Sequence, residues 1–314
     1  MEFYTSLKEE LTRMAPTKTC CVKAELSALI KVDGIISISK SNISLHITHN
    51  NASSARKLLG MLRKTDDIKT EIIMNRRSTL NKGKIYTIKL TGDADVKAIL
   101  RKLGILEEEM TFVNDVPTMF LNSKCCRRSY LRGLFIGCGY FGKPEHGYHM
   151  EFCVSGEEYA KSIIKLLGTF GVEARILNRR DKYIVYVKSS DNIVEVLNIM
   201  GATNSALEFE NMRIVRGIRN NVNRLVNADQ ANIAKSGEAS MRQIEDIQMI
   251  LKNVSLSNLP ESLVCIMDAR LENPDASLTE LGEMVQPNIT KSGVNHRMRR
   301  IAAMAKKYRE ETIK

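Results

Sequence analysis

The sequence predicts an α+β protein in which a duplicated αββαββα unit is followed by an all-α helix-turn-helix domain. Two observations predict this fold class. Residues 19–34, where a Cys-Cys pair leads into an apolar helix that stops at a glycine, recur in pattern as residues 124–139. Residues 260–309 carry two helix-starting signals and change abruptly from acidic to basic side chains. A repeat followed by a compact helical module accounts for both.

The N-terminal part of the chain is predicted as one short helix and one duplicated domain. We assign the helix to residues 1–17 and the domain to residues 18–205, with halves at about 18–110 and 120–205. The period is too long for a solenoid repeat, so the two copies are expected to form one pseudo-symmetric domain. Further matches are two helix ends (residues 58–60 and 166–168), two Asn-Arg-Arg strand ends (75–77 and 178–180) and two helices (96–104 and 193–201).

The two matched helices are expected to pack against each other. Each carries small residues at four-residue spacing, a pattern that lets two helix backbones come close. Each is also expected to end in a left-handed glycine, the residue that best tolerates that conformation. The small faces are Ala24, Ala28 and Val32 in the first helix and Ser129, Gly133 and Gly137 in the second, and the glycines are Gly34 and Gly139.

Composition indicates about two domains and a cytoplasmic location. The chain has 314 residues, of which 43% are hydrophobic, enough to bury a core in each domain. Charged residues such as Lys8 and Glu9 interrupt the N-terminus, so we expect no secretory leader. No apolar stretch is long enough to cross a membrane, so no membrane partner is expected.

The seven cysteines are expected to be free thiols in a reducing compartment. We predict no cofactor and no metal site. A zinc site is disfavoured because adjacent cysteines lack the spacing of a chelating loop. The pair His46 and His49 is disfavoured because residues three apart on a strand point to opposite faces, and the same holds for His146 and His149.

Net charge favours a polyanionic partner. The chain carries a formal charge of +11, and basic residues gather on strand-like segments of both repeats. Alternation along a half-buried sheet would place many of them on the face away from the helices. Candidate phosphate contacts are Arg76, Arg77, Arg179 and Arg180. Scattered surface charge without a partner remains the alternative.

Residues 238–314 are predicted as the helix-turn-helix domain. Ser277 and Glu280 form a capping box that opens a short helix, and Thr290 can cap a longer one. Residues 260–284 hold six acids and one arginine, whereas residues 285–309 hold seven basic residues and no acid. The preceding residues 206–237 are predicted as a helical linker with an Asn-rich hinge that ends at Lys235-Ser236-Gly237.

In a helix-turn-helix, the start of the second helix enters the major groove of double-stranded DNA. Asn295 and His296 can then bond base edges, while Lys291, Arg299 and Arg300 can meet phosphates or guanine. A three-helix protein-interaction module is the alternative. The full set of candidate DNA-binding residues is Ser277, Lys291, Ser292, Asn295, His296, Arg297, Arg299, Arg300, Lys306 and Lys307.

Residues 26–34 (LSALIKVDG) resemble the LAGLIDADG motif of homing endonucleases, and residues 131–139 resemble its second copy. Two such units followed by a helix-turn-helix resemble the WhiA family, known as sporulation regulators and cell-division proteins of Gram-positive bacteria. Residues 277–282 and 291–297 are similar to that family's C-terminal signature. The resemblance covers nearly the whole chain.

The resemblance also implies a vestigial catalytic centre. Active LAGLIDADG nucleases place one acid from each motif at the helix ends, where the two acids hold divalent metals. Asp33 aligns with the first acid, but Cys138 stands where the second should be. A thiol is mostly neutral at pH 7, and Mg²⁺ prefers oxygen ligands, so cleavage is not expected. Glu145 and Glu151 remain alternative sources of a second acid.

The sequence therefore predicts a non-catalytic, nucleoid-associated DNA-binding regulator, involved in cell division and chromosome segregation or in sporulation control. Its partner is double-stranded DNA, and the duplicated domain contributes phosphate contacts or binds a protein partner. The alternatives are an active LAGLIDADG endonuclease and a protein-interaction adaptor that does not bind DNA.

Overall fold

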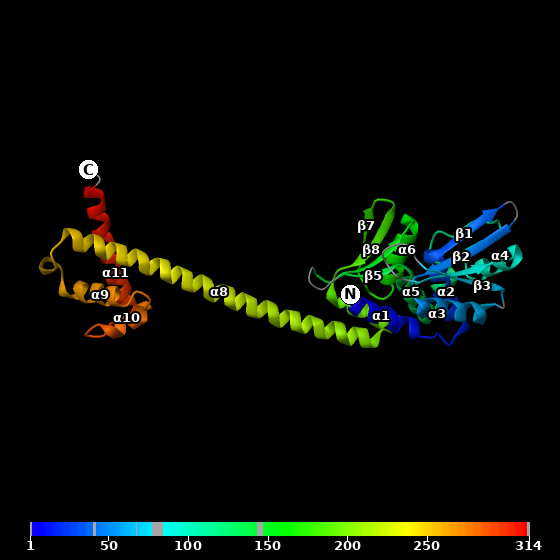
Figure 1. Ribbon diagram of the computed structural model, residues 1–314, viewed down its shortest axis with the longest axis horizontal. Coiled ribbons are helices and arrows are strands. Elements are labelled where there is room, and N and C mark those ends of the chain that lie inside the picture. The colour runs from blue at the N-terminus through cyan, green and yellow to red at the C-terminus, as the bar shows by residue number, and fades with distance from the viewer. Residues whose placement is uncertain (1, 40–41, 67, 77–83, 143–146, 313–314) are drawn as a thin grey trace. The chain divides into compact units, whose positions relative to one another are not determined.

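The computed structural model describes residues 2–39, 42–66, 68–76, 84–142 and 147–312 (Figure 1). The chain forms two compact units, Met1–Ile214 and Val215–Lys314. The first unit opens with α1 (Glu2–Arg13), whose Leu7 and Leu11 are fully buried. No helix in the described residues is both long enough and apolar enough to cross a membrane.

The predicted duplication is confirmed in the first unit. Each repeat has the order αββαββα, and a short 3-10 helix (Thr118–Phe120) lies between the repeats. The first repeat comprises α2 (Thr19–Asp33), β1 (Gly34–Ser39), β2 (Asn42–His49), α3 (Ala52–Thr65), β3 (Thr70–Arg76), β4 (Lys84–Leu90) and α4 (Asp93–Lys102). The second comprises α5 (Lys124–Cys138), β5 (Gly139–Phe141), β6 (Met150–Val154), α6 (Glu157–Gly168), β7 (Arg175–Arg179), β8 (Lys182–Val187) and α7 (Ser190–Met200).

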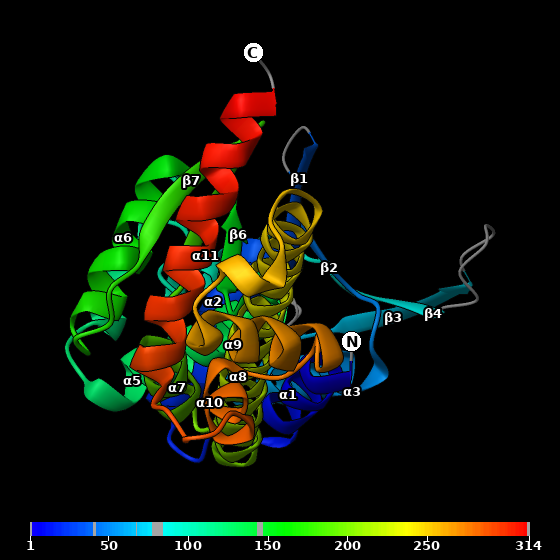
Figure 2. The same cartoon turned by 90° about the vertical axis from the view of Figure 1, so that its left-hand side faces the viewer.

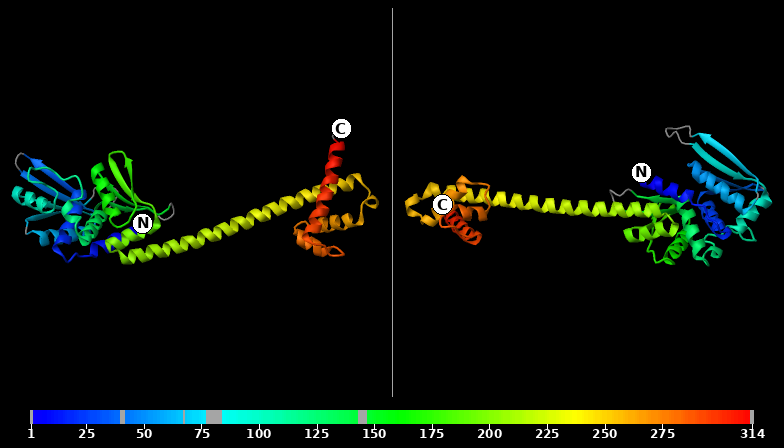
Figure 3. Two further views of the ribbon diagram at one scale, coloured as in Figure 1. Left: turned by 180° about the vertical axis from the view of Figure 1, so that it is seen from behind. Right: turned by 90° about the horizontal axis from the view of Figure 1, so that it is seen from below.

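Each repeat folds into a four-stranded antiparallel sheet with helices on one face. The strand orders are β1-β2-β4-β3 and β5-β6-β8-β7. In β2, Ile43, Leu45 and Ile47 are buried and alternate with more exposed residues, so one face of this strand lies in the core. Helices α3 and α4 pack on the first sheet and α6 packs on the second (Figures 1 and 3). The opposite sheet faces remain open.

The small faces of α2 and α5 meet, as the four-residue spacing predicts. A Cβ atom added to Gly133 would lie 2.3 Å from the carbonyl oxygen of Glu25. One added to Gly137 would lie 2.3 Å from Cγ2 of Val32. The two backbones therefore approach so closely that both positions require glycine.

The expectation of left-handed glycines at the helix ends was wrong. The helices do end at Asp33 and Cys138, but Gly34 has a φ of −81° and Gly139 a φ of −71°. Both glycines are the first residues of strands, so the backbone is already extended there. Glycine is needed for space, since a Cβ on Gly34 would lie 2.3 Å from the carbonyl oxygen of Ile30.

One further helix boundary differs from the sequence prediction. Helix α3 continues through Gly60 to Thr65, whereas its counterpart α6 does end at Gly168. A Cβ at Gly60 would have no atom within 4 Å, so nothing at this position interrupts the helix. Residues Arg77 and Lys82 lie outside the described residues.

The predicted linker is helical throughout. Residues 206–237 belong to α8, one continuous helix from Thr203 to Asn253 (Figures 1 and 3). Asparagine, serine and a single glycine each weaken a helix by less than about 1 kcal/mol, and this segment has no proline to stop it. The N-terminus of α8 is capped from α1, because the Glu10 carboxylate accepts hydrogen bonds from the amides of Asn204 and Ser205, both at 2.9 Å.

The second unit contains the predicted helical domain. It comprises the C-terminal part of α8, a 3-10 helix (Leu256–Asn258), α9 (Glu261–Glu272), α10 (Leu278–Met284) and α11 (Lys291–Thr312). Figure 2 shows α11 in red beside α9 and α10. Its small core draws on the four α-helices and includes Ile247, Ile266, Leu281, Val294 and Ile301.

Candidate nucleic-acid interface

Helices α10 and α11 form a short helix, a tight turn and a longer helix. The predicted capping box is present: the Glu280 amide donates to the Ser277 hydroxyl at 3.3 Å, and the Ser277 amide donates to the Glu280 carboxylate at 2.7 Å. Thr290 begins α11, because its hydroxyl accepts from the Gly293 amide at 3.3 Å. A Cβ at Gly282 would lie 2.2 Å from the carbonyl oxygen of Ile289, so the turn packs directly on α10.

The start of α11 presents polar and basic side chains outward. Val294, Met298, Ile301 and Ala305 are buried, as the predicted apolar stripe requires, and Tyr308 is half-buried. The residues between them lie on the other side of the helix. Lys291, Ser292, His296, Arg299 and Arg300 are exposed, and Asn295 is half-buried.

Three other predicted DNA-binding residues have partners within the protein. The Ser277 hydroxyl is engaged in the capping box. The Arg297 guanidinium donates to the carbonyl oxygen of Ser262 at 3.1 Å, which ties α11 to α9. The Lys306 amine lies 3.9 Å from the Glu310 carboxylate, although both side chains are well exposed, and Lys307 is exposed.

Sequence reasoning missed Arg270, which shapes this domain from inside. Its side chain is buried, and its guanidinium donates to the carbonyl oxygens of Asn273, Pro274 and Ala276. These bonds hold the loop between α9 and α10. Burial lowers the pKa of Arg270 from its usual value, but guanidinium remains charged at neutral pH.

The open faces of the two sheets differ in charge. On the second sheet, Arg175 and Arg179 share the open face with Lys182, which is paired with Arg179 in register. On the first sheet, the open face carries Lys89 directly opposite Glu71. Basic residues were expected on the open faces, and the second sheet fits this expectation better than the first. In the first sheet, Lys84 lies an even number of positions from the buried Ile88, so both are on the same face of β4.

Three of the four predicted phosphate contacts fall within the described residues, at the ends of two corresponding strands. Arg76 is the last residue of β3, in register with Lys84, and Arg77 lies outside the described residues. Arg179 ends β7, and Arg180 occupies the following turn with a φ of 57°. Both Arg179 and Arg180 are exposed, so the second pair is free to meet a phosphate group.

Asp33 and Cys138 come together at the ends of α2 and α5, where the resemblance to LAGLIDADG nucleases places the catalytic pair. Oδ2 of Asp33 would lie 3.0 Å from a Cβ at Gly137, the neighbour of Cys138. The Cys138 thiol instead donates to the carbonyl oxygen of Leu134 at 3.4 Å. Burial, followed by the charge of Asp33, raises the pKa of Cys138 far above its ordinary value, so the thiol is neutral.

The Asp33 carboxylate lies in an unusual environment. It faces His49, with 3.4 Å between Oδ2 and Nδ1, and Oδ2 has no hydrogen-bond partner in the described residues. The expectation that Asp33 caps nearby backbone is therefore not met at this atom. Burial raises the pKa of Asp33 to about 6 and lowers that of His49 to about 4. At pH 7 an ionised carboxylate thus faces a neutral imidazole.

These residues do not fit the hard divalent metals of a nuclease. One ionised carboxylate remains, but the partner position holds a neutral thiol, which Mg²⁺ does not favour as a ligand. Of the alternative acids, Glu151 lies 3.5 Å from His149, and Glu145 is outside the described residues. His46 and His49 do point to opposite faces of β2, as the strand spacing predicts.

A buried ion cluster, also missed from sequence, joins the two repeats. Glu25 of α2 is fully buried and forms two ion pairs. Its Oε2 lies 2.6 Å from Nη2 of Arg132 on α5, and its Oε1 lies 2.5 Å from Nζ of Lys57 on α3. Lys57 also donates to the carbonyl oxygens of Leu11 and Met14, at 2.7 and 2.6 Å. Burial lowers the pKa of Lys57 from its ordinary value. The available sequence signal was a charge, Glu25, between the apolar residues Ala24 and Leu26.

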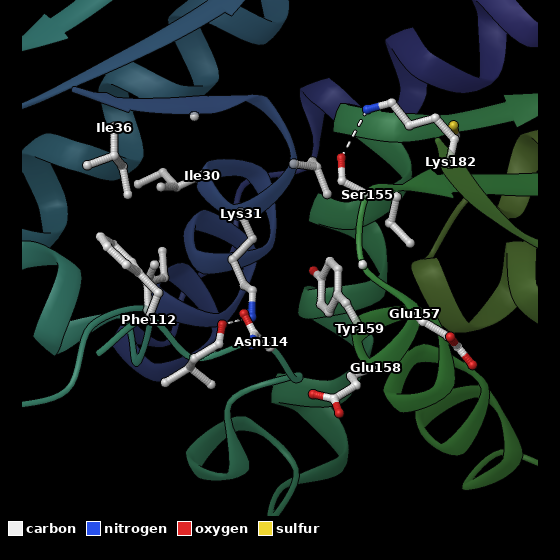
Figure 4. A pocket seen from close by; sticks show the side chains of 17 residues that line it. Ile30, Lys31, Ile36, Phe112, Asn114, Ser155, Glu157, Glu158, Tyr159 and Lys182 are labelled. Atoms are coloured by element: carbon white, nitrogen blue, oxygen red, sulfur yellow. Dashed lines mark hydrogen bonds between the residues drawn. The ribbon is translucent and has the colours of Figure 1, made fainter. Parts of the chain in front are cut away.

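A cavity of about 520 Å³ lies between the repeats beside the end of α2. Figure 4 shows Lys31 extending between Asn114 and Tyr159. The Lys31 amine donates to the carbonyl oxygens of Val113 and Asp115 and lies 4.5 Å from the centre of the Tyr159 ring. Burial lowers its pKa to about 8. Lys31 thus fastens the inter-repeat segment, and the cavity lining carries both acidic and basic side chains, Glu157 and Glu158 together with Lys31 and Lys182.

Within each Cys-Cys pair the spacing is unsuited to a zinc site, but the two pairs are not separate in the fold. Folding brings both pairs together, since the thiols of Cys20, Cys21, Cys125 and Cys126 form one cluster at the starts of α2 and α5. The available signal was the recurrence of the pair at matched positions of the repeat.

Two LAGLIDADG-like repeats with a C-terminal helix-turn-helix domain define the class of this protein. Three family models match in this order: the WhiA N-terminal LAGLIDADG-like domain (residues 19–106), the WhiA LAGLIDADG-like domain (127–219) and the WhiA C-terminal HTH domain (222–305). The chain belongs to the WhiA family.

Full-length relatives and solved structures agree with this assignment. The chain is 41% identical to the "Probable cell division protein WhiA" of Heliobacterium modesticaldum, covering 98% of this chain and 97% of the relative. It is 39% identical to the protein of the same name from Clostridium acetobutylicum, covering 99% of each. The crystal structure of full-length WhiA from Thermatoga maritima is similar with a TM-score of 0.57 and 27% identity, covering 96% of this chain and 97% of that one.

Proposed function

We propose that this chain is a non-catalytic regulator that binds double-stranded DNA and acts in cell division, at the nucleoid in the cytoplasm. One observation carries the proposal: α11 begins with Lys291, Ser292, His296, Arg299 and Arg300 exposed, on a helix fixed by a capped partner helix and a tight turn. This is the arrangement by which a recognition helix presents its first turns to the major groove. The family's HTH domain and the name of its curated relatives support it.

The absence of catalysis belongs to the same proposal. A two-metal mechanism needs oxygen ligands that hold both ions at the scissile phosphate. Here the first motif supplies Asp33 and the second supplies a neutral, half-buried thiol. The duplicated domain then serves as a scaffold that adds phosphate contacts through Arg179 and Arg180.

A protein partner for the duplicated domain is the second candidate, and the first sheet favours it. Its open face is close to electrically neutral, because Lys89 lies opposite Glu71, and it exposes Ile35 (62%) and Ile73 (37%). Exposed aliphatic side chains suit a protein surface better than a phosphate backbone.

The proposal is tested by selecting bound sequences from a random duplex library and measuring affinity for the selected site. Asn295→Ala and Arg299→Ala should each weaken binding by about 1–3 kcal/mol if they contact bases. Arg242→Ala is the control, since Arg242 is an exposed arginine on α8 that pairs with Glu238 in the same helix. A footprint and affinity unchanged by both α11 substitutions would refute the recognition-helix assignment.

Cleavage is scored in the same samples with Mg²⁺ or Mn²⁺ present. We expect binding without strand breaks. Metal-dependent breaks that disappear in Asp33→Asn would establish the endonuclease instead. Complete absence of DNA binding at modest salt would favour the protein-interaction adaptor.

A further inference from the structure

The cysteine pairs of the two repeats meet at one point of the first unit. Cys20 and Cys21 lie in the first turn of α2, and Cys125 and Cys126 lie in the first turn of α5. Their four Sγ atoms all lie within 4.8 Å of one another. The cluster is at the opposite ends of these helices from Asp33 and Cys138, so it is a separate site.

We propose that these four thiols bind one thiophilic metal ion in a tetrahedral site made of four cysteine ligands, and that Zn²⁺ is the ion whose chemistry matches. In such a site the Zn–S bonds are about 2.3 Å, which places the sulfur atoms about 3.8 Å apart. Sulfur atoms already within 4.8 Å need only small side-chain rotations to reach this geometry. A set of four sulfur ligands selects zinc over magnesium or calcium.

Burial of the four thiols is graded. Cys21 and Cys126 are buried, Cys125 is half-buried, and Cys20 is exposed. The exposed side gives an ion a route of entry. The buried pair is held in place by the close α2–α5 contact, in which Gly133 meets the Glu25 backbone.

Two helix starts and two lysine residues lie beside the four thiols. Each pair occupies the start of a helix, where free backbone amides and the helix dipole stabilise negative charge. The residues before the two helices, Lys18 and Ser123, form no side-chain cap hydrogen bond. Lys18 and Lys124 are exposed next to the two pairs and can offset the charge of about −2 on a zinc–tetrathiolate centre.

The ion would join the two repeats, because each supplies half of its ligands. It would cross-link α2 to α5 at one end, while the Glu25–Arg132 ion pair joins the same helices further along. Binding to the folded form alone stabilises that form. This inference does not depend on the proposed DNA-binding function.

The test uses the full-length chain, reduced, stripped with a chelator and titrated with Co²⁺ in the absence of oxygen. We expect one equivalent to bind with the visible absorption bands of tetrahedral cobalt thiolate, and Zn²⁺ to displace it. The double variant Cys20→Ser/Cys125→Ser should lose at least about 100-fold in affinity, since changes outside the ligand shell alone cost 10–100-fold. The control Cys153→Ser/Cys265→Ser, which lies outside the cluster, should bind like the parent protein.

Thermal unfolding gives a second readout that does not depend on the cobalt spectrum. Zn²⁺ should raise the unfolding midpoint of the parent and the control and leave the Cys20/Cys125 variant unchanged. Cys20 and Cys125 are chosen because neither is fully buried, and circular dichroism checks that the variant folds. Absence of thiolate bands in the parent, or equal affinity in the Cys20/Cys125 variant, would overturn the proposal.

Discussion

Asp33 is held in a position that disfavours its own charge. Its carboxyl pKa is raised to about 6 by burial, whereas the unfolded chain titrates near 3.8. The folded state therefore binds the proton more tightly than the unfolded state does. As pH rises from 3.8 through 6, ionisation of Asp33 lowers the free energy of unfolding by about 3 kcal/mol. At pH 7 the whole of this loss has occurred. The ionised carboxylate at the position of the nuclease motif's acid therefore destabilises the folded state at neutral pH.

Replacing Asp33 by Asn should stabilise the protein at neutral pH. We expect the free energy of unfolding at pH 7.5 to rise by about 2–3 kcal/mol, and the gain to shrink steadily as pH falls from 6 toward 4. Chemical denaturation of both proteins across this range measures the difference. His49 is present in both proteins, so its own titration largely cancels. A gain that is the same at pH 4 and pH 7.5 would show that charge is not the cause.

Arg132 illustrates the opposite case, a buried charge that is matched. Arg132→Met should lower the free energy of unfolding by about 3–5 kcal/mol, because it leaves the fully buried Glu25 carboxylate with only Lys57. Lys161→Met is the control, since the Lys161–Glu157 pair is exposed on α6 and such pairs contribute little. Equal effects of the two substitutions in urea denaturation would contradict this reading of the cluster.

At the scale of elements, the α2–α5 contact depends on missing side chains. Gly133→Ala would place a methyl group 2.3 Å from the Glu25 carbonyl oxygen, where only backbone can yield. We expect a loss of about 1–3 kcal/mol in the free energy of unfolding.

The same substitution at another helical glycine provides the matched control. In Gly60→Ala, the new methyl group meets no atom within 4 Å. Alanine then gains helix propensity, and stability should rise by about 0.5–1 kcal/mol. If both substitutions changed the unfolding midpoint in the same direction, close backbone approach would not be what Gly133 provides.

The accuracy of the sequence predictions followed the range of the interactions behind them. The capping box at Ser277 and the small face around Gly133 are local signals, and both are confirmed. The Asn-rich stretch of the linker does not interrupt α8, because asparagine weakens a helix without ending it. Gly34 was given the wrong conformation because the strand that follows it directly requires an extended backbone.

The parts of the candidate sites that sequence did not reveal depend on tertiary contacts. Arg270 looked like an isolated charge on an acidic helix, yet it holds three loop carbonyl groups. Each Cys-Cys pair has poor spacing for a metal, and the complete cluster exists only once α2 lies beside α5. The residues of α11 could be read directly, because its 3.6-residue periodicity separates buried from exposed positions.

At the scale of the whole molecule, DNA binding should combine base contacts from one unit with phosphate contacts from the other. Each phosphate neutralised adds about 0.9 to the slope of log affinity against log salt concentration. Arg179→Ala/Arg180→Ala should therefore flatten the slope of the full-length chain by about 1.8 while leaving the preferred sequence unchanged. Lys161→Ala/Lys165→Ala removes the same charge from α6, which packs on the other face of that sheet, and should change the slope far less. Equal slopes for the parent and both variants would mean that the duplicated domain does not touch DNA, and would favour a protein partner at its open sheet faces.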